Sequence, residues 1–350
     1  MSEKKNVFTR FFVEIFWYTF CVNMVWNTLC KKWIWKGFFV DLVYKKFDKW
    51  KGWLYLTPAL ILLAVFTVWP IINTVRIAFL ENYSTLGEVG GRVYNFGLGN
   101  FRKVLVEYPR FWQYLWNTVF LTITTGPLST FIALLIAVCL NSIKWLNKAL
   151  QTIYFLPYVT NSIAIGMVFA AMFNMSTDGT GAYESIGIMN NVLSWFNVEP
   201  INWINDGSEW WANMFVMVFY IVWNALPFKI LILLGGLQSV NKQYYDAAKI
   251  DSTPKWRVFT KITVPLLSPM IAYVVITGFI GGFKEYSSIV GVFGEVMGPA
   301  NHELDTIVGF IYTSLATSEG RASAAALFLF AIIFAVTMVN LYVSKKNTHY

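Results

Sequence analysis

The feature that most constrains this chain is a series of six long apolar stretches. They lie at residues 54–79, 116–140, 150–173, 212–234, 266–289 and 322–343. Because about 20 apolar residues cross the roughly 30 Å hydrocarbon core as a helix, each stretch predicts one membrane span. Charged residues make up only 13% of the chain, whereas soluble domains carry about 25%. The predicted fold class is therefore all-α, a polytopic membrane protein with six core transmembrane helices.

Charged residues outside these stretches are unevenly distributed. Most of the 27 lysines and arginines fall on four segments, residues 1–52, 141–149, 235–265 and 344–350. Most of the acidic residues fall on the three alternating segments, residues 80–115, 174–211 and 290–321. Basic loops stay on the cytoplasmic side of a membrane, so we expect both termini to be cytoplasmic. The net charge of +8 then reflects membrane orientation, and we expect no nucleic-acid partner.

Residues 11–30 form a seventh apolar stretch, but it differs from the other six. It carries Glu14, and a lysine-rich segment follows it. Crossing the membrane here would place either those lysines or the N-terminal basic residues outside. We therefore expect a helix lying at the membrane interface, with a seventh span as the alternative. The expected division is an N-terminal cytoplasmic or interfacial segment at residues 1–52 and a transmembrane domain at residues 53–345.

A polar segment at residues 240–265 separates the fourth and fifth stretches. The pattern predicts a helix from Lys242 to Ile250, then a break. A second helix is predicted with Pro254 in its first position and Ser252 or Thr253 as its cap. Two small residues on the first helix, at positions 247 and 248, would let the backbone of a partner approach closely. The alternative is a connector that contacts nothing.

This polar segment resembles the EAA loop of binding-protein-dependent ABC importer permeases. The resemblance rests on Asp246-Ala247-Ala248, Asp251-Ser252, Pro265 and Pro269. The chain departs from the family pattern in having Asp246 for Glu, Ser252 for Gly and Val264 for Leu. Further motifs, at residues 95–101, 111–112, 117–118, 154–157 and 322–325, are similar to the sugar branch, which includes the larger membrane subunit of the maltose transporter and the multiple-sugar permeases. The resemblance covers roughly residues 54–345.

The resemblance implies a permease subunit of an ATP-driven importer in the bacterial inner membrane, forming half of the path for a sugar, preferably an oligosaccharide. It also implies three protein partners: a second permease, a cytoplasmic ATPase dimer that carries ATP and Mg²⁺, and an extracytoplasmic solute-binding protein. The chain has no Gly-x-x-x-x-Gly-Lys-Ser/Thr loop for a nucleotide. We therefore expect neither enzyme activity nor a cofactor or metal in this chain. The residues carried over for ATPase coupling are Tyr245, Asp246, Ala247, Ala248, Asp251 and Ser252.

Polar side chains within membrane spans are costly and point to function. A sugar also needs aromatic rings for its faces and hydrogen-bonding groups for its rim. The family's substrate contacts come from the fourth and fifth spans, which gives the candidate residues Asn224, Phe228, Phe283, Lys284 and Tyr286. Neighbouring helical residues are about 100° apart, so Lys284 and Glu285 cannot face one direction. Lys229 is interpreted as a cation that extends towards the membrane surface.

Two other classes of protein are compatible with the composition. A secondary carrier or channel would act without ATP and would use Lys284 and Glu285 to relay ions or protons. A membrane enzyme would need a catalytic cluster, and His302, Glu303 and Asp305 form the one candidate. We interpret that cluster instead as part of an outer surface that docks a binding protein.

Overall fold

The computed structural model describes residues 52–53, 55–83, 95–143, 147–177, 183–294 and 304–347. The expected interfacial helix at residues 11–30 lies outside the described residues, as do His302 and Glu303. The chain divides into two compact units, Met1–Ile71 and Ile72–Tyr350. In the first unit the described residues are helical and include a π-helical stretch, η1 (Ala64–Val68). A helix over Tyr55–Ala78, which ends as α3 (Trp69–Ala78), is long and apolar enough to cross a membrane.

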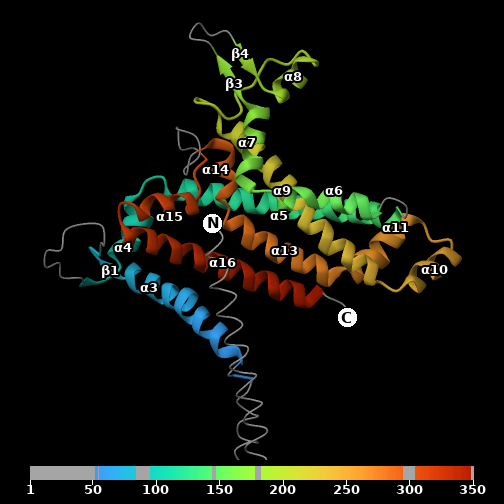
Figure 1. Cartoon of the computed structure of the whole chain (residues 1–350), viewed down its shortest axis with the longest axis horizontal. Helices are drawn as coiled ribbons and strands as arrows, with labels where there is room; N and C mark the ends of the chain where they lie inside the picture. Colours follow the sequence, from blue (N-terminus) through green and yellow to red (C-terminus); the bar gives the residue numbers. More distant parts are fainter. Residues whose placement is uncertain are drawn as a thin grey trace, which may run out of the picture. The chain divides into compact units, whose positions relative to one another are not determined.

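Three long apolar helices dominate the second unit: α5 (Phe111–Ser142), α9 (Trp210–Ser239) and α16 (Glu319–Asn347). A further helix, α13 (Ser268–Phe283), follows the helical segment Lys255–Leu266 at a bend of 70°. In the bundle drawn in Figure 1, α5 packs against α9 and α13, and α13 packs against α16. With Tyr55–Ala78, the described residues therefore provide four helices that can cross a membrane, or five if the bent pair is one span.

The third predicted span, residues 150–173, is divided into two helices. These are α6 (Asn147–Val159) and α7 (Ser162–Phe173). Asn161 caps α7, because its side chain accepts a hydrogen bond from the backbone N–H of Ile163 at 2.8 Å. Near its middle, α7 crosses α14 (Ser287–Phe293), and a Cβ on Gly166 would lie 2.6 Å from the Cα of Gly291. Small residues therefore allow the two backbones to touch.

Shorter elements connect the long helices. Antiparallel pairs are formed by β1 (Leu80–Glu81) with β2 (Asn95–Phe96), and by β3 (Met175–Thr177) with β4 (Tyr183–Ile186). The remaining short helices near these strands are α4 (Gly99–Arg102), η2 (Lys103–Glu107), α8 (Ile188–Ser194) and α15 (Ile307–Leu315). The connection from α9 to α13 consists of α10 (Lys242–Ile250), α11 (Lys255–Val258), η3 (Phe259–Thr263) and α12 (Val264–Leu266).

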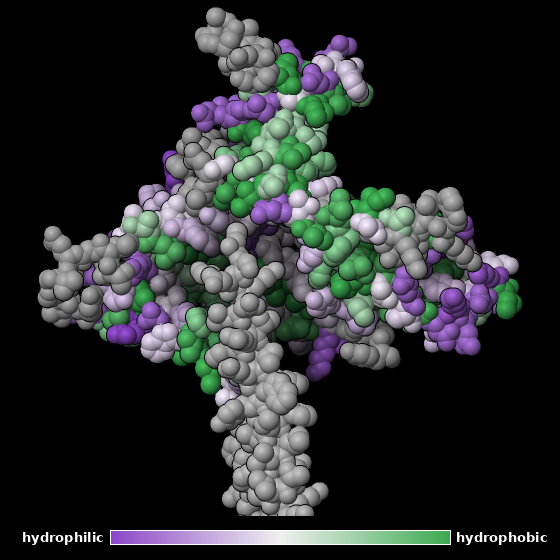
Figure 2. All heavy atoms as spheres, in the orientation of Figure 1, coloured by the Kyte–Doolittle hydropathy of each residue, from purple (hydrophilic) through white to green (hydrophobic). Residues whose placement is uncertain are grey.

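Three groups of buried apolar side chains hold the second unit together. One surrounds Tyr220 where α9 meets α7, and another surrounds Phe310 where α15 meets α5 and α16. The third surrounds Leu233 where α9 meets α5 and α13. Figure 2 shows hydrophobic residues on the surface over the helices and hydrophilic residues gathered at the α10–α11 end. A surface of this kind is stable when lipid covers the helices and water covers that end.

Candidate functional site

A cavity of about 250 Å³ lies between α5, α6, α9 and α13. Aromatic rings line part of its wall: Phe228 of α9 stacks on Tyr158 of α6, with ring centroids 5.7 Å apart and planes 19° apart. The polar side chains of its wall are Thr125, Ser129, Asn224, Lys229, Thr277 and Glu285. Glycines at positions 126, 278, 281 and 282 widen the space. Apolar rings beside several polar groups are typical of a site for a polar small molecule.

Lys229 is held inside the bundle and does not extend to its surface. Its side chain is 4% exposed. Its Nζ donates to the carbonyl of Gly126 at 3.0 Å, to Ser129 Oγ at 2.6 Å and to Thr130 Oγ1 at 3.1 Å. An ammonium group has three hydrogens, so α5 accepts all of them. The interpretation of Lys229 as a cation extending to the surface is therefore wrong. The ammonium stays inside because the carbonyl of Gly126 is not shielded by a side chain, and the hydroxyls of Ser129 and Thr130 provide the other two acceptors.

The α5 wall is polar because hydroxyl side chains recur along one side of that helix. Thr118, Thr122 and Thr125 each donate to the backbone carbonyl four residues earlier, at 2.7 to 2.8 Å. Ser129 makes the same bond to the carbonyl of Thr125. These bonds satisfy the hydroxyl hydrogens within an apolar surrounding. The hydroxyl oxygens can still accept a hydrogen bond, as Ser129 Oγ does from the ammonium of Lys229.

Glu285 reaches the cavity from a break between two helices. The fifth stretch, residues 266–289, was expected to be one helix, but α13 ends at Phe283 and α14 begins at Ser287. Glu285 lies in this break, and its Oε1 accepts the backbone N–H of Ser288 at 3.2 Å. Lys284 is exposed and is not one of the described residues that line the cavity. Broken helices of this kind commonly present binding groups in transport proteins.

The five residues expected to contact substrate do not all meet at this cavity. Asn224 and Phe228 line it. Phe283 is buried among the side chains of α5, α15 and α16, and Lys284 is exposed. Tyr286 stacks on Tyr312, with centroids 4.3 Å apart. Sequence reasoning missed the α5 hydroxyls and the α13 glycines, although the recurrence of Thr and Ser every three or four residues from 118 to 130 would have indicated a polar side of the helix.

Asp305 is buried at the end of the bundle where α5 and α15 begin. The side chain of Asn117 joins three elements there, since it donates to the carbonyl of Asp305 at 3.0 Å and accepts from Trp210 Nε1 at 2.9 Å. Thr306 Oγ1 donates to the carbonyl of Glu285 at 3.4 Å. Asn117 therefore connects the loop before α15 to α5 and α9. Thr306 connects the same loop to the break that carries Glu285.

Burial raises the pKa of the Asp305 carboxyl to about 7. The nearby Tyr114 hydroxyl and the charge of Arg110 lower the pKa, but their effects are smaller. The carboxyl is fully enclosed, so removal of water from around the charged form dominates. Burial therefore brings the pKa of this carboxyl close to neutral pH.

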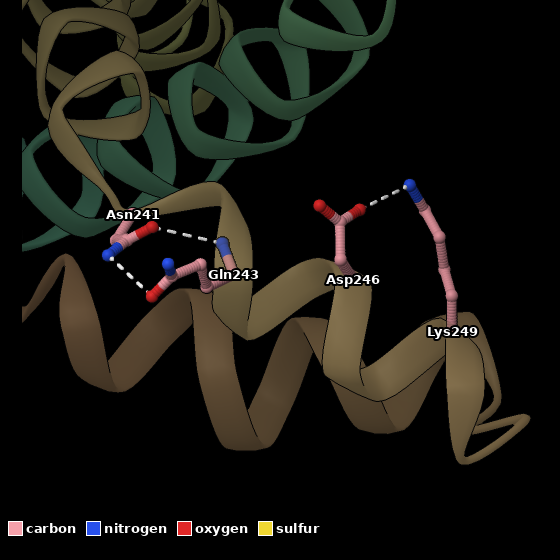
Figure 3. A network of polar contacts seen from close by, with 4 residues as sticks. All are labelled: Asn241, Gln243, Asp246 and Lys249. Atoms are coloured by element: carbon pink, nitrogen blue, oxygen red, sulfur yellow. Dashed lines mark hydrogen bonds and ion pairs between the residues drawn. The ribbon is translucent and has the colours of Figure 1, made fainter.

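The second candidate region is the hairpin of α10 and α11. The first predicted helix has the predicted bounds, Lys242–Ile250. Asn241 caps it by accepting the N–H of Gln243 at 3.0 Å, and Asp246 pairs with Lys249 at 3.0 Å (Figure 3). The second helix begins one residue later than predicted: Pro254 is the N-cap, without a side-chain cap bond, and Lys255 is the first helical residue.

Ser252 occupies a left-handed turn, with φ of 50°. The N–H of Thr253 bonds to the carbonyl of Ala248 at 2.9 Å, and that of Ser252 to the carbonyl of Lys249 at 3.1 Å. This pair of bonds is a Schellman motif, which usually has glycine at the left-handed position. The bend therefore forms with serine in place of the family's glycine.

The two alanines of the hairpin have different surroundings. Ala247 is exposed, whereas Ala248 is 6% exposed. Tyr245 also faces its own chain, since its hydroxyl lies 3.4 Å from Thr263 Oγ1. Large apolar side chains are exposed nearby, with Ile250 at 84% and Trp256 at 71%. Exposed apolar residues beside charged ones are typical of a surface that binds another protein.

Comparison with known proteins identifies the family. Residues 129–349 match the model of the family described as binding-protein-dependent transport system inner membrane component. The lactose transport system permease protein of Rhizobium radiobacter is 29% identical over 299 residues, which cover 85% of this chain and 93% of the relative. The arabinooligosaccharides transport system permease protein of Bacillus subtilis is 32% identical over 308 residues, covering 87% and 91%.

A solved structure has the same fold. It is the crystal structure of a bacterial ABC transporter involved in the import of the acidic polysaccharide alginate. One of its chains superposes with a TM-score of 0.72 at 20% identity, covering 88% of this chain and 99% of that one. The helical bundle and the family match agree, and this chain belongs to the binding-protein-dependent inner membrane component family, as a multi-pass permease subunit of an ABC importer.

Proposed function

We propose that this permease forms half of the translocation path for an uncharged oligosaccharide, with the cavity between α5, α9 and α13 as its substrate site. The observation that carries the proposal is the composition of the cavity wall. Tyr158 and Phe228 offer stacked rings, and Asn224, Thr277 and Glu285 offer hydrogen-bonding groups. Relatives named for lactose and arabinooligosaccharide transport support a carbohydrate substrate.

The charged groups of the cavity favour a neutral substrate. All three hydrogens of the Lys229 ammonium are directed to α5, so a substrate carboxylate could bind it only by replacing one of those bonds. Glu285 adds a carboxylate that can accept hydrogen bonds from sugar hydroxyls. The described residues that line the cavity include no arginine that could hold an anion through a bidentate pair.

The hairpin of α10 and α11 is proposed as the surface that couples this chain to a cytoplasmic ATPase dimer, which would bind ATP and Mg²⁺. Ala247 lies on its exposed side, with Ile250 and Trp256 nearby in the sequence. The Schellman turn at Ser252 fixes the angle between its two helices. In this proposal both chain termini are cytoplasmic, a second permease completes the path, and an extracytoplasmic binding protein delivers the sugar.

Copurification from the native host tests this assembly. A tagged chain is extracted in mild detergent, and the copurifying proteins are identified by mass spectrometry. We expect an ATPase and a second permease in stoichiometric amounts. Recovery of the chain alone, with transport in liposomes that lack ATP, would favour the secondary carrier instead.

Replacement of Phe228 by alanine tests the substrate site. We expect reduced sugar uptake with normal recovery of the ATPase, because Phe228 lines the cavity and lies on α9, away from the hairpin. Tyr286→Ala is the comparison, since Tyr286 stacks on Tyr312 outside the cavity wall. A larger loss of uptake from Tyr286→Ala than from Phe228→Ala would move the site away from this cavity.

A further inference from the structure

A second crevice, of about 240 Å³, runs between α13 and α16. Five residues of α13, at positions 268, 271, 272, 275 and 276, line one wall at helical spacing. Asn340, Val343 and Ser344 of α16 and Val264 of α12 complete it. The cavity proposed for sugar lies between α5, α6, α9 and α13, and no described residue lines both spaces.

The lining of the crevice is apolar except for Ser268, Asn340 and Ser344, and the two serines mark its polar end. Ile271, Val275 and Ile276 line its apolar part. Near the start of α13, the hydroxyl of Ser268 is shielded from solvent and has no hydrogen-bond partner among the described residues. Ser344, at the end of α16, lines the crevice as well. A buried hydroxyl without a partner is costly, and rotation of the Ser268 side chain towards the crevice would let a ligand acceptor bind its hydroxyl.

Two lysines lie next to the polar end in sequence. Lys345 follows Ser344, and Lys261 precedes Val264 by three residues. Both side chains are exposed, and neither forms an ion pair within the described part of the chain. Lysines on the cytoplasmic side of a membrane-spanning helix attract anionic lipid head groups. Two exposed lysines therefore lie close in sequence to residues that line the crevice.

The dimensions of the crevice favour a lipid chain over a protein helix. From Ser268 to Ile276 the α13 wall is about 12 Å long, at 1.5 Å per residue. A volume of about 240 Å³ for the centres of water-sized spheres, spread over that length, gives a radius of roughly 2.5 Å, or about 4 Å once the sphere radius of about 1.4 Å is added. A helix with its side chains has a radius of at least about 5 Å. A single acyl chain fits this narrow space.

We propose that this crevice binds one anionic phospholipid of the cytoplasmic leaflet, with an acyl chain between α13 and α16 and its phosphate near Ser268, Lys261 and Lys345. The proposal rests on the orientation given under the proposed function. The bound lipid would lie where the connection from the α10–α11 hairpin, through η3 and α12, enters α13. It would therefore stabilise the segment that holds the proposed coupling surface in position.

Lipid titration of the purified importer, followed by native mass spectrometry, tests this site independently of transport. The probes are phosphatidylglycerol and phosphatidylcholine. We expect tighter retention of phosphatidylglycerol. Each lysine near an anionic head group contributes about fivefold in affinity, so the double variant Lys261→Gln/Lys345→Gln should reduce that preference by about 25-fold. Lys242→Gln/Lys255→Gln, which changes two exposed lysines of α10 and α11, is the matched control for lipid retention.

A second variant tests the apolar part of the crevice. Ala272→Phe places a ring in it and should reduce retention of both lipids, whereas Ala335→Phe, at an exposed alanine of α16 outside the crevice, should not. Sugar uptake is measured in parallel, so that failure of the lipid site is distinguished from failure of the proposed transport function.

Four results would each overturn the proposal. The first is equal retention of the two lipids by the unmodified importer, and the second is equal effects of the two lysine pairs. The third is displacement of phosphatidylglycerol by inorganic phosphate, which would indicate a simple anion site. The fourth is retention by the isolated chain but not by the importer, which would show that the second permease covers the crevice.

Discussion

Filling the α5–α9–α13 cavity without disturbing the protein is the sharpest test of the proposed substrate site. Gly281 lines the cavity, and among the described residues a Cβ built there meets no atom within 4 Å beyond its own turn of helix. Gly281→Leu adds four carbon atoms. At about 30 Å³ each, the share of a water molecule in the liquid, they would occupy roughly 120 Å³ of a cavity of about 250 Å³. We expect the loss of most sugar uptake.

The same substitution should not harm folding. Glycine in a helix interior is about 0.5 to 1 kcal/mol less favourable than alanine, and leucine is also a good helix former. Gly281→Leu should therefore leave thermal stability unchanged or slightly raised. Gly235→Leu is the matched control, because Gly235 is also an exposed helical glycine with nothing within 4 Å of its Cβ position, and it lies outside the cavity wall.

The assay is uptake by the importer in proteoliposomes, with its binding protein, ATP and the sugar which that protein retains. Uptake at the unmodified rate by Gly281→Leu would refute the assignment of this cavity. Equal loss of uptake in Gly281→Leu and Gly235→Leu would show that the effect comes from bulk in the membrane helices and not from the cavity.

Three further predictions concern the hairpin and Asp305. Ala247→Trp should weaken copurification of the ATPase with unchanged stability, whereas Ala248→Trp, at a buried position, should also lower the melting temperature; normal ATPase recovery with Ala247→Trp would count against docking there. Ser252→Gly should slow amide hydrogen exchange at residues 251–253, because it removes a left-handed strain of about 1 kcal/mol, and faster exchange would contradict this. The folded-state pKa of Asp305, about 7, exceeds the ordinary value near 4. The contribution of this group to the free energy of unfolding is therefore complete below about pH 4 and is lost as the pH rises to 7. Asp305→Asn should therefore gain roughly 2 to 3 kcal/mol of stability relative to the unmodified protein between pH 5 and pH 8, measured by thermal unfolding, and a difference that does not change with pH would contradict the burial argument.

The sequence predicts those parts of the fold that depend on local patterns. The bounds of the first hairpin helix, Lys242–Ile250, follow from its polar flanks and are confirmed. Long apolar stretches likewise predict α5, α9 and α16, because length and hydropathy alone decide whether a helix can cross a membrane. The bend at Ser252 also forms, although serine replaces the family's glycine.

Features that depend on contacts between distant residues could not be predicted in this way. The break after Phe283 is stabilised by bonds from Thr306 and Ser288, and the charged pair Lys284-Glu285 in the sequence does not by itself specify such a break. Lys229 is buried because Gly126, about a hundred residues earlier, offers a bare carbonyl. Asn161 divides the third stretch because its side chain caps the start of α7. This is a local signal, but the apolar residues on both sides of Asn161 favour one continuous helix.

The central claim is that this permease moves a sugar through a path driven by a partner ATPase. Its most direct test is uptake of labelled oligosaccharide by the copurified complex in liposomes, with and without ATP and the binding protein. Uptake that requires both would agree with the account. Uptake of the same sugar by this chain alone, without ATP and driven by an ion gradient, would contradict it.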